Sequence, residues 1–431
     1  MSGTIVNNIT RTSGTIAPTT GGLSWGSDVI TGSTASVSAG NGYWINTTSN
    51  ACTVTLPSSA AIGDQIILAD YARTWSTNNL IIDSNGNNFQ GSPDSFTVDY
   101  STAGQSLSIV YSDATKGWIP VSDDAVVNAP VAPTIQKGIF GFGNGAGYAN
   151  TGVTNIVSSS GVVASDVSAV GTARNGLAAA SYGGDKAIFA YGHTSTSGNQ
   201  TSSLSNLVSN SGVVASDVTG VGSARRYLAA ASYGGDKAIF AYGSTAGNGY
   251  AYVSLKNLVN SSGVVAADVT GVGTARAFLA AAGYGGDKAI FAYGKASGNL
   301  SMSNLVNSSG VVASDVTGVG TARYRIAAAS YGVGLAIFGY GDSGSLTAIT
   351  NKVNSSGVVA SDTSGVGTAR GQLAATVFGG DKAIFGYGSA SGAAFSSMTN
   401  IVSNSGVVAA DVTGVGSGRN DLAASGFSTS A

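Results

Sequence analysis

Residues 177–192 read LAAASYGGDKAIFAYG. Two apolar stretches flank a Gly-Gly-Asp-Lys turn, and the paired glycines supply the positive φ angles that a tight β-hairpin needs. The second stretch recurs along the chain, with its isoleucine at Ile139, Ile188, Ile239, Ile290, Ile337 and Ile384, at spacings of 47 to 51 residues. The sequence therefore contains six copies of one hairpin-forming unit.

Two further segments complete the repeat. The first apolar stretch begins at Leu177, Leu228, Leu279, Ile326, Leu373 and Leu422, and a segment similar to SSGVVASDVTGVGTAR also occurs six times. Each unit predicts four short strands, LAAASYG, KAIFAYG, NLVNSS and VVASDV. Repeats of this length with four strands each favour the blades of a β-propeller over a solenoid.

The repeat region begins and ends within a unit. It opens at Lys137 with a second strand and finishes at Phe427 with a first strand. We expect residues 422–427 to pair beside residues 138–143, because a closed ring hides the edges of its sheets. The predicted fold is all-β: an N-terminal β-sandwich, then a six-bladed β-propeller over residues 137–431 that is closed by strands from both ends of the repeat region.

The first third of the chain has a different character. All four tryptophans lie there, at Trp25, Trp44, Trp75 and Trp118. Between residues 37 and 124, several segments of alternating polar and apolar residues are separated by turn residues, which predicts a β-sandwich. Residues 1–36 are rich in Thr, Ser and Gly and are interpreted as an attachment segment. Residues 125–136 contain two prolines and are interpreted as a linker.

Composition limits the classes of function. The chain has 431 residues with 64 Gly and 9% charged residues, and all 21 acidic residues are Asp. A net charge of −2 leaves no basic field to hold nucleic acid or an anionic membrane. We see neither a signal-peptide pattern nor an apolar run long enough to span a bilayer. We therefore expect that the protein does not bind nucleic acid and does not insert into a membrane.

Residues suited to catalysis or metal binding are scarce. His193 is the only histidine, and we expect it at the surface of a polar loop. Cys52 is the only cysteine; it alternates with Val54 and Leu56, which predicts a place in the sandwich core. One His and one Cys in different domains cannot build an ordinary zinc or copper site. Paired aspartates leave glycosidic cleavage open, but the Asp residues repeat uniformly, so no catalytic residue, metal or cofactor is predicted.

Six Asp–Arg pairs recur, one in each unit, with the two residues eight positions apart. They are Asp166 and Arg174, Asp217 and Arg225, Asp268 and Arg276, Asp315 and Arg323, Asp362 and Arg370, and Asp411 and Arg419. Each pair flanks the predicted crossover to the next blade, and we expect an ion pair that holds this loop. A charged ring that binds a ligand is the alternative.

Variation between units carries the functional signal. The repeats differ in the dipeptide after each Arg and in the loop between the second and third strands, which share one face of a blade. The GGDK and Ser-Gly turns lie on the other face. The predicted ligand-binding residues are Asn175, Arg226, Tyr227, Phe278, Tyr324, Arg325, Gln372, Asn420, Asp421, Tyr148, Tyr250, Tyr252 and Phe395. Such side chains stack on sugars and make polar contacts at binding surfaces; free drift of exposed loops is the alternative.

The repeats resemble those of kelch propellers. The shared features are the paired Gly183–Gly184, Tyr191–Gly192 at the end of the second strand, and Arg174 before the next first strand. The resemblance spans residues 137–431 and departs from the family pattern because these repeats contain no Trp.

The N-terminal module resembles a part of tail-fibre and other virion proteins of tailed bacteriophages, cyanophages among them. The likeness runs from GYWINTT (42–48) to KGW (116–118). It implies a place in the virion after synthesis in the host cytoplasm, contacts with other virion proteins through residues 1–124, and a homotrimer. We therefore expect a phage tail fibre, or adhesin, whose propeller binds a host-surface glycan or protein. The alternatives are a capsid decoration or baseplate protein whose propeller contacts other virion proteins, and a polysaccharide depolymerase.

Overall fold

The computed structural model describes residues 9–12, 15–18, 23–94, 98–123, 135–194, 200–246, 249–391 and 395–430. The chain divides into two compact units, Met1–Pro133 and Thr134–Ala431, and the regular structure of both is almost entirely β-strand. Strands β1 (Ile9–Thr12) and β2 (Thr15–Pro18) form a hairpin within the expected attachment segment. Most of that segment before residue 23, and residues 125–134 of the expected linker, lie outside the described residues.

The N-terminal unit contains two sheets around one core. The first has the order β11 (Trp118–Asp123), β10 (Ser106–Tyr111), β7 (Gln65–Asp70), β5 (Asn41–Ile45), β3 (Ser24–Ile30). The second has the order β4 (Thr34–Ser36), β6 (Cys52–Thr55), β8 (Leu80–Asp83), β9 (Val98–Tyr100). Cys52, Val54 and Leu56 are buried in the core, as predicted.

Successive strands from β3 to β8 alternate between these two sheets. Within each sheet they pair in parallel, β3 with β5 and β5 with β7, and β4 with β6 and β6 with β8. In this half of the unit the backbone therefore follows a superhelical path, the parallel coil, in which each turn adds one strand to each sheet. Alternation of polar and apolar residues has the same period in parallel and antiparallel strands, so the sequence pattern does not reveal the coil.

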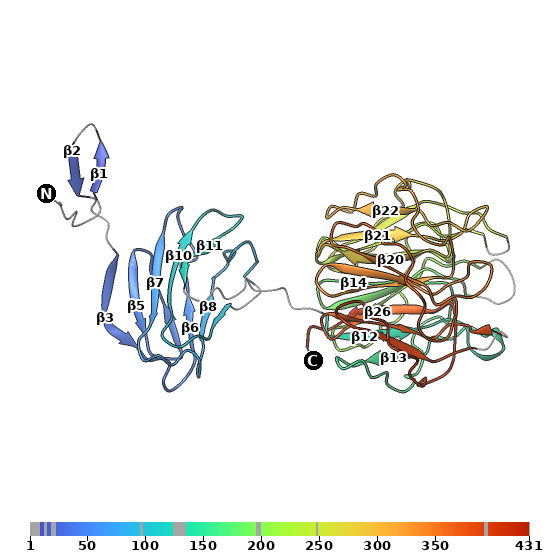
Figure 1. Ribbon diagram of the computed structural model, residues 1–431, viewed down its shortest axis with the longest axis horizontal. Helices are drawn as coiled ribbons and strands as arrows, with labels where there is room; N and C mark the ends of the chain where they lie inside the picture. The colour runs from blue at the N-terminus through green and yellow to red at the C-terminus, as the bar shows by residue number, and fades with distance from the viewer. Residues whose placement is uncertain are drawn as a thin grey trace. The chain divides into compact units, whose positions relative to one another are not determined.

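The C-terminal unit contains six three-stranded antiparallel sheets, which we number as repeats 1 to 6 (Figure 1). Repeat 1 is β29 (Ala423–Phe427), β12 (Lys137–Gly141) and β13 (Thr154–Val157); repeat 2 is β14 (Ala178–Tyr182), β15 (Lys186–Ala190) and β16 (Ser205–Val208); repeat 3 is β17 (Ala229–Tyr233), β18 (Lys237–Ala241) and β19 (Lys256–Val259). Repeat 4 is β20 (Ala280–Tyr284), β21 (Lys288–Ala292) and β22 (Ser303–Val306); repeat 5 is β23 (Ala327–Tyr331), β24 (Leu335–Gly339) and β25 (Thr350–Val353); repeat 6 is β26 (Ala374–Phe378), β27 (Lys382–Gly386) and β28 (Thr399–Val402).

The first strands of the six sheets contact one another in cyclic order. The contacts run from β14 to β17, β20, β23, β26 and β29 in turn, and β29 contacts β14. The sheet of repeat 1 comes from both ends of the region, because β12 pairs antiparallel with β29, from Lys137 opposite Phe427 to Gly141 opposite Ala423. The predicted pairing of residues 422–427 beside 138–143 is thus confirmed.

The predicted fourth strand, VVASDV, is wrong. Its residues make only two isolated bridges to the third strand, which in repeat 1 join Val157 to Val163 and Thr154 to Val167. The two bridged residues of β13 are three positions apart, whereas their partners in the outer segment are four positions apart. The extra residue of the outer segment forms a β-bulge. The side chain of Asn155 fills the interruption, donating two hydrogen bonds of 3.0 and 2.9 Å to the bulged segment.

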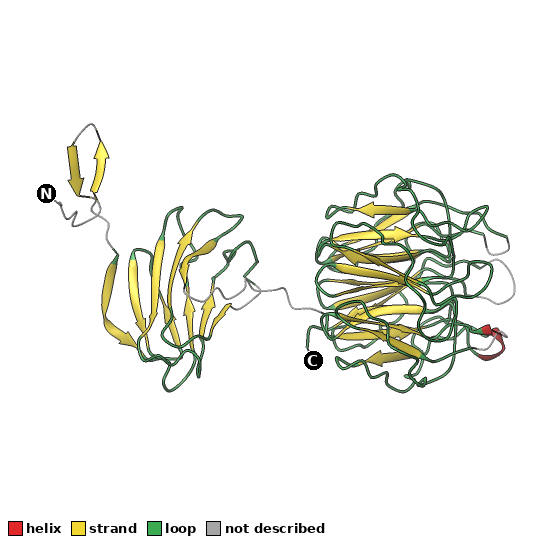
Figure 2. Ribbon diagram, viewed as in Figure 1, coloured by secondary structure: helices red, strands yellow, loops and turns green. Residues whose placement is uncertain are grey.

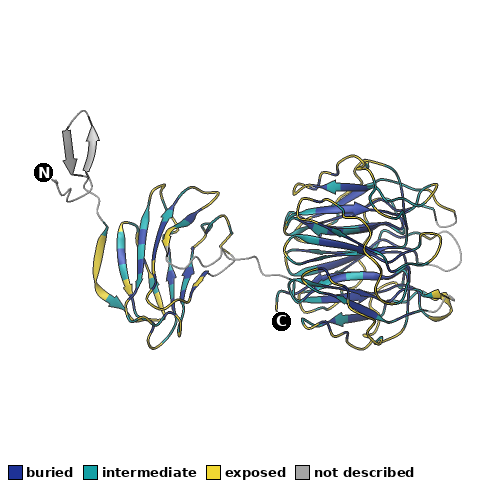
Figure 3. Ribbon diagram, viewed as in Figure 1, coloured by how far each residue is buried: buried dark blue, intermediate teal, exposed yellow. Residues whose placement is uncertain are grey.

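Burial explains the near-continuous apolar second strand. In β15, Ala187 to Ala190 are all buried, because alternate residues pack against the sheets of repeats 1 and 3. Figure 3 shows buried residues along the strands throughout this unit. The loops after the second strands leave one end of the sheets, where the 3₁₀ turn Ala146–Tyr148 also lies (Figure 2). The crossovers reach that same end, since Asn175 in a crossover bridges to His193 at the start of such a loop. We call it the variable end.

Closure can be tested by truncation. A chain that ends at Arg419 lacks β29, which leaves β12 without its inner partner and opens the ring of sheets. We expect aggregation and loss of the cooperative unfolding transition of the C-terminal unit, measured by light scattering and calorimetry. A chain that ends at Ser428 keeps all five residue pairs between β12 and β29 and should unfold like the full chain. Unchanged melting of the shorter chain would contradict the closure.

Candidate ligand-binding site

Each of the six predicted arginines is fully buried, at 0% exposure, and joins two neighbouring sheets. In repeat 2, Nε of Arg174 donates to the carbonyl oxygen of Tyr191 at 2.9 Å, and Nη2 donates to Oδ1 of Asn206. The guanidinium carbon lies 4.6 Å from the ring centre of Phe142, which follows the second strand of repeat 1. Arg174 thus hydrogen-bonds to one sheet and contacts an aromatic ring of the preceding one through its planar face.

The predicted partners within the ion pairs are wrong, although all twelve residues form such pairs. Arg174 lies 3.6 Å from Asp217 rather than beside Asp166, and Asp166 lies 3.9 Å from Arg419. The other pairs are Arg225–Asp268, Arg276–Asp315, Arg323–Asp362 and Arg370–Asp411. The reason is topological: an Arg precedes the first strand of its sheet and its Asp follows the third, so residues eight apart belong to different sheets.

The aspartates are held by several donors. Asp217 accepts hydrogen bonds from the Oγ1 of Thr172 at 2.6 Å and from Nδ2 of Asn206 at 2.9 Å. Burial alone would raise the pKa of Asp217, but these hydrogen bonds and the charge of Arg174 hold it below its usual value. Burial lowers the pKa of Arg174 to about 10, so it stays charged at neutral pH. These contacts favour the structural interpretation of the twelve residues.

The buried asparagine of each third strand is a functional part of this cluster that the sequence analysis missed. Its six copies are Asn155, Asn206, Asn257, Asn304, Asn351 and Asn400, all at 0% exposure. Each accepts from an arginine through Oδ1 and donates to an aspartate through Nδ2. The available signal was its presence in every unit, as in SNLV and TNIV, at a strand position where an apolar residue is expected.

The second residue of each variable dipeptide lies in a closed ring of backbone hydrogen bonds. Its members are Gly176, Tyr227, Phe278, Arg325, Gln372 and Asp421. The amide of each donates to the carbonyl oxygen of the equivalent residue in the preceding repeat at 2.7 to 3.0 Å, and Gly176 closes the ring by donating to Asp421. We call these six residues the axial ring.

All six residues of the axial ring adopt the left-handed conformation, with φ between 50° and 60°. Glycine accepts this conformation without strain, whereas a residue with a Cβ pays roughly 1–2 kcal/mol. Gly176 shows that glycine fits the ring. The other five positions carry side chains in this conformation, which Asp tolerates more readily than Tyr, Phe, Arg or Gln. The constant aromatic residue after each second strand, such as Tyr191, also has positive φ.

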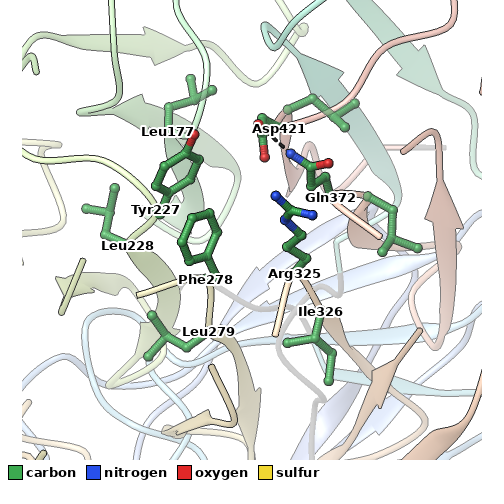
Figure 4. A pocket seen from close by; sticks show the side chains of 12 residues that line it. Leu177, Tyr227, Leu228, Phe278, Leu279, Arg325, Ile326, Gln372 and Asp421 are labelled. Carbon is green, nitrogen blue, oxygen red and sulfur yellow. Dashed lines mark hydrogen bonds between the residues drawn. The ribbon is translucent and has the colours of Figure 1, made fainter. Parts of the chain in front are cut away.

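The axial ring lines a pocket at the variable end, together with the aliphatic residue that follows each member (Figure 4). These aliphatic residues are Leu177, Leu228, Leu279, Ile326, Leu373 and Leu422. The centre of a water-sized sphere can move through about 70 Å³ of this axial pocket. Figure 4 shows Tyr227 and Phe278 on one side of it and Arg325, Gln372 and Asp421 on the other.

The aromatic side of the axial pocket is continuous with residues outside it. The rings of Tyr227 and Phe278 stack with centres 4.0 Å apart, and Tyr250 and Tyr324 pack edge-on against Phe278 at 5.5 and 5.8 Å. Tyr252 in turn stacks on Tyr250 at 5.5 Å. Five of the predicted aromatic residues therefore form one cluster.

The polar side consists of groups that constrain one another. Nε2 of Gln372 donates to Oδ2 of Asp421 at 2.8 Å, and Arg325 lies 3.9 Å from Asp342. Nε of Arg325 is buried and has no hydrogen-bond partner among the described residues. Burial raises the pKa of Asp421 to about 6, although Gln372 and the charges of Arg325 and Arg226 act to lower it.

The remaining predicted binding residues lie around the axial pocket rather than in it. The guanidinium carbon of Arg226 is 4.8 Å from the ring centre of Tyr227. Asn175 and Asn420 are buried, and Nδ2 of Asn420 donates to Oε1 of Gln372 at 3.3 Å. Tyr148 and Phe395 form a separate edge-to-face pair at 5.1 Å, outside the residues that line the pocket.

The expectation that His193 is a surface residue is wrong, because its exposed fraction is 5%. Its amide donates to the carbonyl oxygen of Asn175 at 2.8 Å, and the amide of Asn175 donates back at 3.1 Å. The equivalent residue in every repeat makes the same bridge to the crossover. In repeat 4 it is Lys295, whose Nζ lies 4.6 Å from the ring centre of Tyr324.

The asparagine of the cluster should matter for stability. Asn206→Ala leaves a buried N–H of Arg174 without its acceptor, and we expect a loss of about 1–3 kcal/mol in the free energy of unfolding. Asn210→Ala is the matched control, because that side chain donates to Asp185 at the surface; its effect should stay within about 0.5 kcal/mol. Denaturant titration measures both. Equal effects of the two substitutions would contradict the role assigned to Asn206.

Strain in the axial ring can be measured by comparing two substitutions. At Gln372, where φ is 57°, the Gly variant should be more stable than the Ala variant by about 1 kcal/mol, because Ala keeps the strain. Ser216 is exposed and does not have positive φ, so there the order should reverse. Thermal and denaturant unfolding of the four variants give the comparison. An Ala variant at 372 as stable as the Gly variant would show that the ring is unstrained.

Among the described residues, no group of three or more His, Cys, Asp or Glu side chains is placed to hold a metal ion. No helix in the described part of the chain is long and apolar enough to cross a membrane. No protein-family model and no curated protein matches the chain.

Proposed function

We propose that the chain is a non-enzymatic fibre protein of a phage virion, in which the C-terminal unit is a six-bladed β-propeller that binds a host-surface glycan or protein. Three features support a propeller: the cyclic contacts of the first strands, the pairing of β12 with β29, and the closed hydrogen-bond ring at the variable end. Each sheet is then one blade, in which the bulged outer segment takes the place of a fourth strand.

The observation that carries the binding proposal is the contrast within the axial ring. Six equivalent positions share one backbone conformation and one hydrogen-bond pattern, yet they hold Gly, Tyr, Phe, Arg, Gln and Asp. Five of the six accept backbone strain that glycine would avoid. The opposite end is more uniform, with GGDK in four turns and Gly-Val-Gly-Leu at 332–335 as an exception. Recognition of a ligand explains why the side chains at the variable end differ.

The N-terminal unit would mount the propeller on the particle. Its support is the resemblance of residues 40–120 to tail-fibre modules, which also implies a homotrimer and contacts with other virion proteins. Several propellers on one particle would raise a weak affinity at each site through multivalency.

A second candidate function is a decoration or baseplate protein whose propeller contacts other virion proteins. The observation in its favour is a set of six equivalent valines in the outer segments, each 56–65% exposed. They are Val162, Val213, Val264, Val311, Val358 and Val407. Labelling the protein in purified particles and locating it by electron microscopy separates the two candidates, because a decoration protein would follow the lattice of the shell.

Binding of the intact protein to whole bacterial cells and to an array of bacterial surface glycans tests the first proposal. Tyr227→Gly and Arg325→Gly remove side chains of the axial ring without adding backbone strain, since both positions have positive φ. We expect each variant to lose at least tenfold in binding. Val333→Ser changes a residue that is 92% exposed at the opposite end and should bind like the unmodified protein. Unchanged binding by both Gly variants would remove the variable end from the proposal.

A further inference from the structure

The size of the axial pocket limits its occupant. The space of about 70 Å³ that a water centre can reach holds on the order of five waters, at roughly 10–15 Å³ for each. This is room for one six-membered ring and not for a chain of several. A longer molecule would therefore enter with one terminal unit and leave the rest outside.

The two sides of the axial pocket differ in chemistry. Tyr227 and Phe278, with the aliphatic residues beneath the axial ring, offer apolar and aromatic surface to C–H groups. Across the space, Arg325 has a buried Nε without a hydrogen-bond partner among the described residues. Asp421 accepts one hydrogen bond from Gln372, whereas a carboxylate has about four acceptor sites. An occupant with one apolar face and several hydroxyl groups satisfies both sides.

The charge of the lining argues against an ionic occupant. The lining contains one cation, Arg325, and one anion, Asp421. An anionic ligand would meet the carboxylate of Asp421, and a cationic ligand would meet the guanidinium of Arg325. A neutral molecule with donor and acceptor groups meets these two opposite charges without adding an unbalanced buried charge.

We infer that the axial pocket binds the terminal unit of a glycan, an uncharged hexopyranose, with a C–H face toward Tyr227 and Phe278 and hydroxyl groups toward Arg325, Gln372 and Asp421. This inference rests on the proposed function, because it names the ligand class of the same binding face. It adds that recognition is confined to one sugar ring and depends on the polar side of the axial pocket.

The test is to titrate the intact chain with D-glucose, D-galactose, D-mannose and D-glucuronate and to measure binding by ligand-observed NMR. We expect millimolar binding of at least one neutral hexose and weaker binding of glucuronate. Phe278→Gly, which suits the positive φ of that position, and Asp421→Asn should each weaken hexose binding at least tenfold. Val333→Ser serves as the control and should leave hexose binding unchanged.

A pH series on the unmodified chain is independent of any folding defect in the variants. Asp421 faces Tyr227, Arg226 and Arg325, and burial raises the pKa of its carboxyl to about 6, which lies within the range of the pH series. Lowering the pH from 7.5 to 5 protonates it and removes a carboxylate acceptor, so hexose binding should weaken about tenfold. The Asp421→Asn variant should show no such dependence between these pH values.

Several outcomes would overturn the inference. The first is that the protein binds cells or glycans but no hexose. The second is that neither Phe278→Gly nor Asp421→Asn alters hexose binding. The others are that glucuronate binds more tightly than any hexose, or that hexose binding does not change with pH. In each of these cases the proposed adhesin could still bind through other residues. If the intact protein binds neither sugars, cells nor arrayed glycans, the proposed function fails as well.

Discussion

The buried arginine between neighbouring sheets is the interaction on which the C-terminal unit depends. A fully desolvated guanidinium is costly unless every donor is satisfied, and here one sheet supplies carbonyl, amide and carboxylate acceptors while the preceding sheet supplies an aromatic ring. Five interfaces share this full set of contacts. At the sixth, Arg419 keeps its amide, carboxylate and ring contacts, but its Nε has no hydrogen-bond partner among the described residues. Because Arg419 binds Asn155 and Asp166 of repeat 1, the last interface joins the end of the region to its beginning. The stability of the ring is therefore distributed over similar contacts between neighbours.

This cluster also determines where the chain can vary. Each arginine fixes a crossover two residues before the axial ring, and the backbone of that ring is fixed again by hydrogen bonds between repeats. With the backbone held from both sides, the side chain of the ring residue is not needed for structure. That explains how Tyr227, Arg325 and Asp421 can occupy equivalent positions without disturbing the fold, and why strained conformations persist there.

Repetition made part of the structure predictable. Six units, the pairing of the two ends, and the gathering of the crossovers and loops at one end all followed from the order of the strands. The arginine–aspartate contacts were misassigned because a spacing of eight residues along the chain crosses from one sheet to the next, and Arg174 meets Asp217 instead. The bulge beside Asn155 and the burial of His193 depend on side-chain hydrogen bonds and loop packing, which strand patterns do not reveal. In the N-terminal unit, the same limitation hid the parallel coil.

If the proposed function holds, the candidate site must let a nearly sixfold backbone recognise a ligand that has no such symmetry. A backbone with six equivalent positions presents the same groups in every direction, so only the side chains can distinguish one side of the axial pocket from the other. Here the difference is systematic, with Tyr227 and Phe278 in consecutive repeats and Arg325, Gln372 and Asp421 in the next three. Random drift of exposed residues has no reason to group aromatic and polar residues on opposite sides, or to favour bulky residues where glycine is unstrained. Under the proposed function, this grouping of side chains favours the axial pocket over the outer loops as the part that would determine specificity.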